Sequence, residues 1–130
     1  MNPISIIKLQ AIAGELAICK LSPKETIPAW AASSFFLSIT RTPEELSLIC
    51  DHRLVPVGIK SEAPWRALRV KGTLDFSLTG ILSSISVPLA KVGISIFVIS
   101  TFDTDYLLVK TEIFSKAIQV LKESGFEVTE

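Results

Sequence analysis

The hydrophobic pattern is clearest in the second half of the chain, where strand and helix periods follow one another. Apolar and polar residues alternate over 65–71, which predicts a strand. Over 78–92 the apolar residues recur at spacings of three and four, which predicts an amphipathic helix interrupted by Pro88. Gly93 is typical of a helix end, and the almost continuous apolar run 94–99 then predicts a strand in the middle of a sheet.

The same succession of elements continues to the end of the chain. Residues 106–109 predict a partner strand, a second helix is expected from Thr111, and 126–128 predict a closing strand. Residues 65–128 therefore predict the order βαββαβ of ferredoxin-like folds, with two helices on one face of a four-stranded antiparallel sheet. The other face of such a sheet needs a cover, which either the first half of the chain or a second copy can supply.

The first half of the chain predicts mostly strands. Apolar runs at 4–9 and 14–21 predict two neighbouring strands, and strand character returns at 35–40. Thr42, followed by a proline and two glutamates, has the pattern of a helix start. We therefore expect a short helix that ends near Cys50.

A polar segment with a proline, 60–64, is the predicted domain boundary. It would separate a β-rich unit of residues 1–61 from an α+β unit of residues 62–130. A chain of 130 residues can form one compact domain or two small ones that share apolar surface.

Charge and composition exclude several kinds of partner. The 13 basic and 13 acidic side chains balance and are scattered singly, so a nucleic-acid surface is not expected. The chain has neither a signal sequence pattern nor an apolar run of membrane-spanning length, so we expect no membrane association and a cytoplasmic location. Cys19 and Cys50 each lie within an apolar run and are predicted to be buried thiols rather than a redox pair.

Catalytic chemistry is not predicted. His52 is the single histidine, so a triad or a histidine metal site would have to use it, and a surface or capping role fits its place better. Asp103 and Asp105 share a turn, but without further ligands they favour neither a metal nor an acid–base pair. We expect no enzyme activity, no metal and no cofactor.

Two runs of sequence carry a family resemblance. GILSSISVPLAKVGISI at 80–96 is similar to the first helix and second strand of ACT domains. ISTFDTDYLLV at 99–109 resembles small tandem-ACT proteins related to the eukaryotic cytosolic arginine sensors, the CASTOR family. FFLSITRT and EELSLI, between residues 35 and 49, resemble the degenerate first domain of those proteins. The resemblance implies an α+β fold of two tandem ferredoxin-like units, the first of them degenerate and poor in helix.

The same resemblance implies a regulatory or sensor protein. Its ligand would be a free amino acid or a similar small molecule at an interface between ACT domains, with a homodimer and an unidentified regulated protein as partners. In the family the ligand contacts the loop before the first helix and the turn between the second and third strands. Carried over by position, the ligand-binding residues are Asp75, Phe76, Ser77, Leu78, Gly80, Ile81, Thr101, Phe102 and Asp105.

Each part of this predicted site has a simpler interpretation. The turn from Ser77 to Gly80 could hold a carboxylate with free backbone amides, or Asp75 or Ser77 could merely cap the helix. Asp105 could accept hydrogen bonds from an ammonium group, or it could be a hairpin aspartate in solvent. Phe102 is expected to be partly exposed in either case. The alternative function is a structural or protein-interaction module that has the fold but no ligand.

Overall fold

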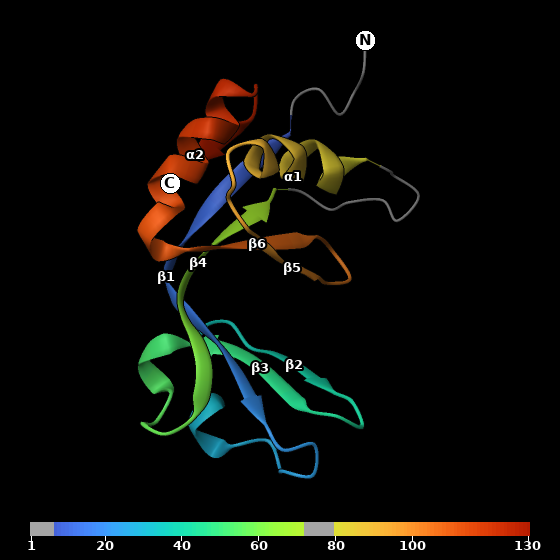
Figure 1. The fold of residues 1–130 in the computed structure, drawn as a ribbon, viewed down its shortest axis with the longest axis vertical. Coiled ribbons are helices and arrows are strands. Elements are labelled where there is room, and N and C mark those ends of the chain that lie inside the picture. The colour runs from blue at the N-terminus through green and yellow to red at the C-terminus, as the bar shows by residue number, and fades with distance from the viewer. Residues whose placement is uncertain (1–6, 72–79) are drawn as a thin grey trace. The chain divides into compact units, whose positions relative to one another are not determined.

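The computed structural model describes residues 7–71 and 80–130, and contacts divide the chain into two compact units. Unit 1 consists of Met1–Ala13 and Arg66–Glu130, and unit 2 is Gly14–Trp65 (Figure 1). The border at residues 65 and 66 lies close to the boundary that the sequence predicts at 61 and 62. The start of the chain, however, is grouped with the second half, because its strand pairs there.

The second half of the chain has the element order predicted from its periodicity. These elements are β4 (Lys60–Val70), α1 (Ile81–Lys91), β5 (Phe97–Ser100), β6 (Asp105–Lys110), α2 (Phe114–Glu123) and β7 (Glu127–Thr129). A short 3-10 turn, η4 (Thr111–Ile113), precedes α2. The order βαββαβ is therefore confirmed, although β4 runs through the segment 60–64 that was predicted to be a polar linker.

An additional strand modifies the sheet of unit 1. Hydrogen-bonded neighbours follow the order β7, β1, β4, β6 and β5, because the first residues of β1 (Lys8–Leu21) lie between β7 and β4. Leu9 pairs with Val128 in a parallel ladder, and both side chains are buried. The predicted four-stranded antiparallel sheet therefore has an additional strand, β1, which pairs with β7 in parallel fashion. A strand from outside the βαββαβ order joins the sheet because its apolar residues reach the same core.

Both helices bury the apolar stripes that their spacing predicts. Helix α1 buries Ile81, Ile85 and Leu89, whereas Val92, also expected in its stripe, is 45% exposed. Helix α2 buries four residues and packs beside α1, as Figure 1 shows. The two stripes pack against alternate residues of the strands and form one core with them. The strand residues in this core are Leu9, Leu68, Val70, Leu107, Val109 and Val128. Alternation places those strand residues on one face of the sheet.

Strand β5 does not have the central position expected from its apolar run. It lies at the edge of the sheet and pairs in antiparallel fashion with β6. Phe97 and Val98 are each 37% exposed. The run 94–99 is apolar because Ile94 enters the core before the strand begins, while Phe97 starts the exposed edge. A continuous apolar run therefore does not by itself show that a strand is central.

Unit 2 contains a hairpin where the sequence predicts a helix. Strands β2 (Ser38–Arg41) and β3 (Leu46–Asp51) pair in antiparallel fashion, and β3 also pairs with the second half of β1. The Thr42 hydroxyl accepts hydrogen bonds from the Glu44 and Glu45 amides at 3.2 Å. The Thr42 amide donates to the Glu45 carbonyl at 2.9 Å, which closes a turn. The polar pattern is thus that of a turn cap, and the predicted helix over 42–50 is wrong.

One continuous strand replaces the two that were expected before residue 22. Strand β1 passes through Gly14, whose φ of 93° lies in the left-handed region that favours glycine. A Cβ atom at Gly14 would lie 2.9 Å from Cζ of Phe35, so the glycine also makes room for that ring. The second of the expected strands begins at residue 14, whereas here Gly14 lets one strand continue past a close contact. Two 3-10 turns, η2 (Ala29–Ala31) and η3 (His52–Leu54), complete the unit.

The two cysteines lie together in the core of unit 2. Cys19 is opposite Leu48 in the ladder and Cys50 is opposite Ala17, so the two thiols are diagonal neighbours on one face of the sheet. Both are buried free thiols, as predicted. A hydrogen bond from one thiol to the other, together with burial, raises the pKa of the Cys50 thiol well above its ordinary range.

Asp51, at the end of β3, is a buried carboxylate that a basic side chain neutralises. Nη2 of Arg53 lies 3.0 Å from Oδ2 of Asp51, and the Arg53 amide donates to Oδ1, also at 3.0 Å. These hydrogen bonds hold the pKa of Asp51 below its usual range. Because the folded-state pKa is the lower one, Asp51 stabilises the fold above the ordinary aspartate pKa, and this stabilisation is lost as the pH falls.

We therefore expect Asp51→Asn to make the stability of the protein less sensitive to acid. At neutral pH the variant unfolds at a lower urea concentration than the wild type. The difference between the two urea midpoints narrows as the pH falls to about 3. Urea midpoints measured across this range test the prediction. Glu44→Gln, at an exposed residue of the same hairpin, serves as the control with no such change. If the difference between the two urea midpoints stayed the same at every pH, protonation of Asp51 would not be linked to the stability of the fold.

Candidate functional site

The first turn of α1 begins at a residue without a side chain. Gly80 is the N-cap of the helix and has a left-handed φ of 81°. Its carbonyl accepts hydrogen bonds from the Ser84 amide at 2.9 Å and from the Ser83 hydroxyl at 3.1 Å. A helix start of this kind presents backbone amides and partial positive charge, which favour an anionic group.

The turn between β5 and β6 is a tightly bonded polar structure. The Thr101 amide donates to the Thr104 carbonyl at 2.8 Å, and the Thr104 amide donates to the Thr101 hydroxyl at 3.2 Å. Between them Phe102 is 81% exposed, as the sequence analysis expects. A rigid turn of this kind holds an aromatic ring in solvent, where it can contact a ligand or a partner.

One hydrogen bond fixes this turn to the strand that leads toward α1. Thr104 is 3% exposed, and its hydroxyl donates to the Val70 carbonyl at 2.8 Å. Val70 is the last residue of β4, and the chain continues from there through 72–79 to Gly80. The turn therefore lies beside the start of the segment that carries the other half of the predicted site.

Asp105 is the charged residue of this turn. It is half-buried, and its Oδ1 accepts a hydrogen bond from the Ser100 hydroxyl at 2.5 Å. Its other oxygen has no hydrogen-bond partner among the described residues. A carboxylate held by one neighbour still has acceptor sites for an ammonium group.

The predicted ligand-binding residues fall into three groups. Asp75, Phe76, Ser77 and Leu78 lie outside the described residues. The side chain of Ile81 is 7% exposed and belongs to the core, so a ligand there would meet its backbone rather than its side chain. Gly80, Thr101, Phe102 and Asp105 are at least partly accessible. In Figure 1 the start of α1 and the β5–β6 turn both project toward the same side of unit 1.

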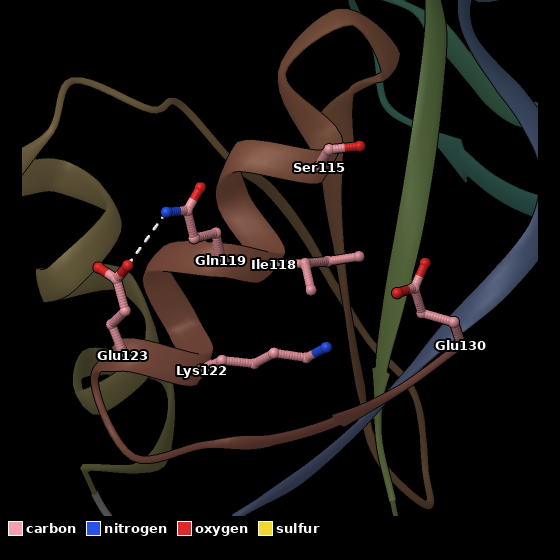
Figure 2. A pocket seen from close by; sticks show the side chains of 6 residues that line it. All are labelled: Ser115, Ile118, Gln119, Lys122, Glu123 and Glu130. Carbon is pink, nitrogen blue, oxygen red and sulfur yellow. Dashed lines mark hydrogen bonds between the residues drawn. The ribbon is translucent and has the colours of Figure 1, made fainter.

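A hollow that the sequence analysis missed lies against α2. It measures about 360 Å³, and its lining residues are Ser115, Ile118, Gln119, Lys122, Glu123 and Glu130 (Figure 2). Five of the six lie on α2 at helical spacing, which the sequence could have shown. Glu130 joins them because β7 pairs with the start of β1 and directs the end of the described chain past α2. No local pattern in the sequence indicates this pairing.

The described part of the chain has neither a cluster of metal-ligating side chains nor a membrane-spanning helix. No three side chains of His, Cys, Asp or Glu within 7–71 and 80–130 gather as metal ligands do. Among the same residues, none of the helices has the length and apolar character needed to cross a membrane. His52 lies in η3 on the surface, next to the pair of Asp51 and Arg53.

Comparison with known proteins assigns the fold to a class. An α+β unit in the order βαββαβ, with both helices on one face of the sheet, is a ferredoxin-like fold. Residues 60–123 match the family model of the ACT domain, and this part of the chain belongs to that family. A second model, of an N-terminal domain, matches residues 14–57.

Two relatives are similar over different shares of the chain. The human cytosolic arginine sensor for mTORC1 subunit 1 is 31% identical over 99 residues, which are 68% of this chain but 30% of that protein. The chain therefore spans less than a third of this curated relative. A crystal structure from Agrobacterium tumefaciens is 41% identical with a TM-score of 0.87, covering 94% of this chain and 91% of that one.

A more distant neighbour shows the fold alone. The regulatory subunit of aspartate kinase from Thermus thermophilus, in its ligand-free form, has a TM-score of 0.60 at 10% identity. The superposition covers 89% of this chain and 96% of that subunit.

Proposed function

We propose that this protein is a non-catalytic regulatory protein that senses a free amino acid. The ligand is held at an interface between ACT units, which a homodimer completes, and the occupied form acts on a regulated protein in the cytosol. The two matched models support a tandem of an ACT unit and a degenerate first unit. The arginine sensor among the relatives supports an amino acid as the class of ligand.

The observation that carries this proposal is the bond between Thr104 and Val70. It anchors the β5–β6 turn beside the start of the segment that leads to Gly80. An α-amino acid has a carboxylate and an ammonium group on one carbon, so its site needs opposite charges a short distance apart. The amides that open α1 suit the carboxylate, and the open oxygen of Asp105 suits the ammonium group.

Sensing follows from differential binding. A ligand shifts a conformational equilibrium only by the difference between its affinities for the two states. An amino acid that joins the start of α1 to the turn at Asp105 binds best to the state in which these two elements are properly spaced. The regulated partner then distinguishes that state from the empty one.

One observation favours the alternative, a structural module without a ligand. The Ser100 hydroxyl already satisfies one oxygen of Asp105, and at 2.5 Å the bond is short. An aspartate that only closes a hairpin turn needs no further partner. In this alternative, the exposed ring of Phe102 serves a protein contact instead.

A thermal-shift screen of the twenty amino acids distinguishes the two functions. A ligand present at a hundred times its dissociation constant stabilises the folded state by about 2.7 kcal/mol. For a chain of this size, such stabilisation raises the melting temperature by several degrees. We expect one amino acid, or a few of related chemistry, to do so at millimolar concentration. If all twenty leave the melting temperature unchanged, the module without a ligand is the better account.

A further inference from the structure

The hollow beside α2 has opposite charges on its two walls. Lys122 extends from the helix, and Glu130 lies on the segment that follows β7. Figure 2 shows the ammonium group of Lys122 and the carboxylate of Glu130 directed into the same space. No ion pair joins these two residues, although both belong to the described part of the chain. The two charges thus face a gap rather than each other.

The rest of the lining separates into a floor and a side wall. Ser115, Ile118 and Lys122 are three and four residues apart, so they share one face of α2. Ile118 is 5% exposed and forms an apolar floor, while the Ser115 hydroxyl adds a polar group. On the side wall, the Gln119 amide donates to Glu123 at 3.1 Å. That bond engages one oxygen of Glu123, and Figure 2 shows this carboxylate beside Gln119, on the side of α2 away from Glu130. Glu130 is therefore the carboxylate that faces Lys122 across the hollow.

Size and charge together define the ligand class. A volume of about 360 Å³ is at the small end of ligand sites, which suits a molecule of amino-acid size. A cation and an anion on opposite walls suit a molecule with both charges, because either charge alone meets repulsion from one wall. The apolar floor and the methylene stem of Lys122 suit a short aliphatic side chain.

We propose that this hollow is a second small-molecule site, which binds a zwitterion such as a short aliphatic α-amino acid. Lys122 binds the carboxylate, and Glu130 binds the ammonium group. The proposal does not depend on the proposed function, because it shares no residue with the start of α1 or the β5–β6 turn. Either site can exist without the other.

A nuclear magnetic resonance titration of the full chain with three matched probes tests this site. L-Valine has both charges, 3-methylbutanoate lacks the ammonium group, and isobutylammonium lacks the carboxylate. We expect valine to move the backbone amide signals of Ser115, Gln119 and Lys122 in a saturable manner. 3-Methylbutanoate and isobutylammonium should each bind at least about tenfold more weakly than valine, because each loses one charged hydrogen bond.

Substitutions on the two walls complete the test. Lys122→Gln and Glu130→Gln each weaken valine binding by about tenfold or more. Lys116→Gln removes an exposed lysine of the same helix that does not line the hollow, and it leaves binding unchanged. The proposal is overturned if valine leaves the α2 signals unmoved or if 3-methylbutanoate binds as well as valine. It is also overturned if Lys116→Gln has the same effect on valine binding as Lys122→Gln. Movement confined to Thr101, Phe102 and Asp105 would support the proposed function and overturn the α2 site.

Discussion

Leu107→Ala should lower the free energy of unfolding by about 2–5 kcal/mol, because it leaves a cavity in a core that cannot fully collapse. Leu107 lies on β6, is 0% exposed and packs in the cluster that joins the sheet to both helices of unit 1. Urea denaturation with a two-state fit gives the free energy directly. The loss matters for function, because β6 begins at Asp105.

The matched control for this variant is its partner in the neighbouring strand. Val98 pairs directly with Leu107, but it lies on the edge strand β5 and is 37% exposed. Val98→Ala should therefore lower the free energy of unfolding clearly less than Leu107→Ala does, since water already reaches Val98. Equal losses from the two variants would mean that Leu107 is packed no more tightly than a residue at the edge of the sheet.

Asp105→Asn should remove most of the stabilisation provided by the amino acid that the thermal-shift screen identifies. The substitution keeps the size of the side chain but removes its negative charge, and each charged hydrogen bond contributes about 1.5–3 kcal/mol. We therefore expect the dissociation constant, measured by calorimetric titration, to rise by about tenfold to a hundredfold. The stability of the empty protein should change far less, because the bond with Ser100 is exposed.

Asp103 provides the matched control for this second variant. It has the same side chain, lies two residues earlier in the same turn and is exposed. Asp103→Asn should bind the amino acid as the wild type does. If Asp105→Asn also binds normally, the aspartate is a hairpin residue, and the ammonium group is held elsewhere.

The second half of the fold was predicted well because each of its helices and strands has a recognisable local sequence pattern. Ile81, Ile85 and Leu89 lie on one helical stripe, and a left-handed glycine follows at residue 93 with a φ of 75°. The predictions failed where a local pattern fits two structures. Thr42 caps a turn rather than a helix, since Leu46, Leu48 and Cys50 alternate along a strand and are all buried.

Long-range pairing limited the prediction of the sheet and of the sites. No sequence pattern indicates that Leu9 joins a ladder with Val128, more than a hundred residues away. This pairing inserts β1 into the sheet of unit 1, and it also brings Glu130 to α2. The turn at Thr101–Asp105 was predicted more closely, because its threonines and aspartates have a local hydrogen-bonding role.

The most direct measurement follows backbone amide signals while the stabilising amino acid is added. If the start of α1 and the β5–β6 turn hold one ligand, the signals of Gly80 and Ile81 move together with those of Thr101 and Asp105, at a single dissociation constant. Asp105→Asn then weakens both sets of changes equally. Saturable binding that leaves both sets unmoved, or that moves only one of them, would contradict an amino-acid site shared by these two elements.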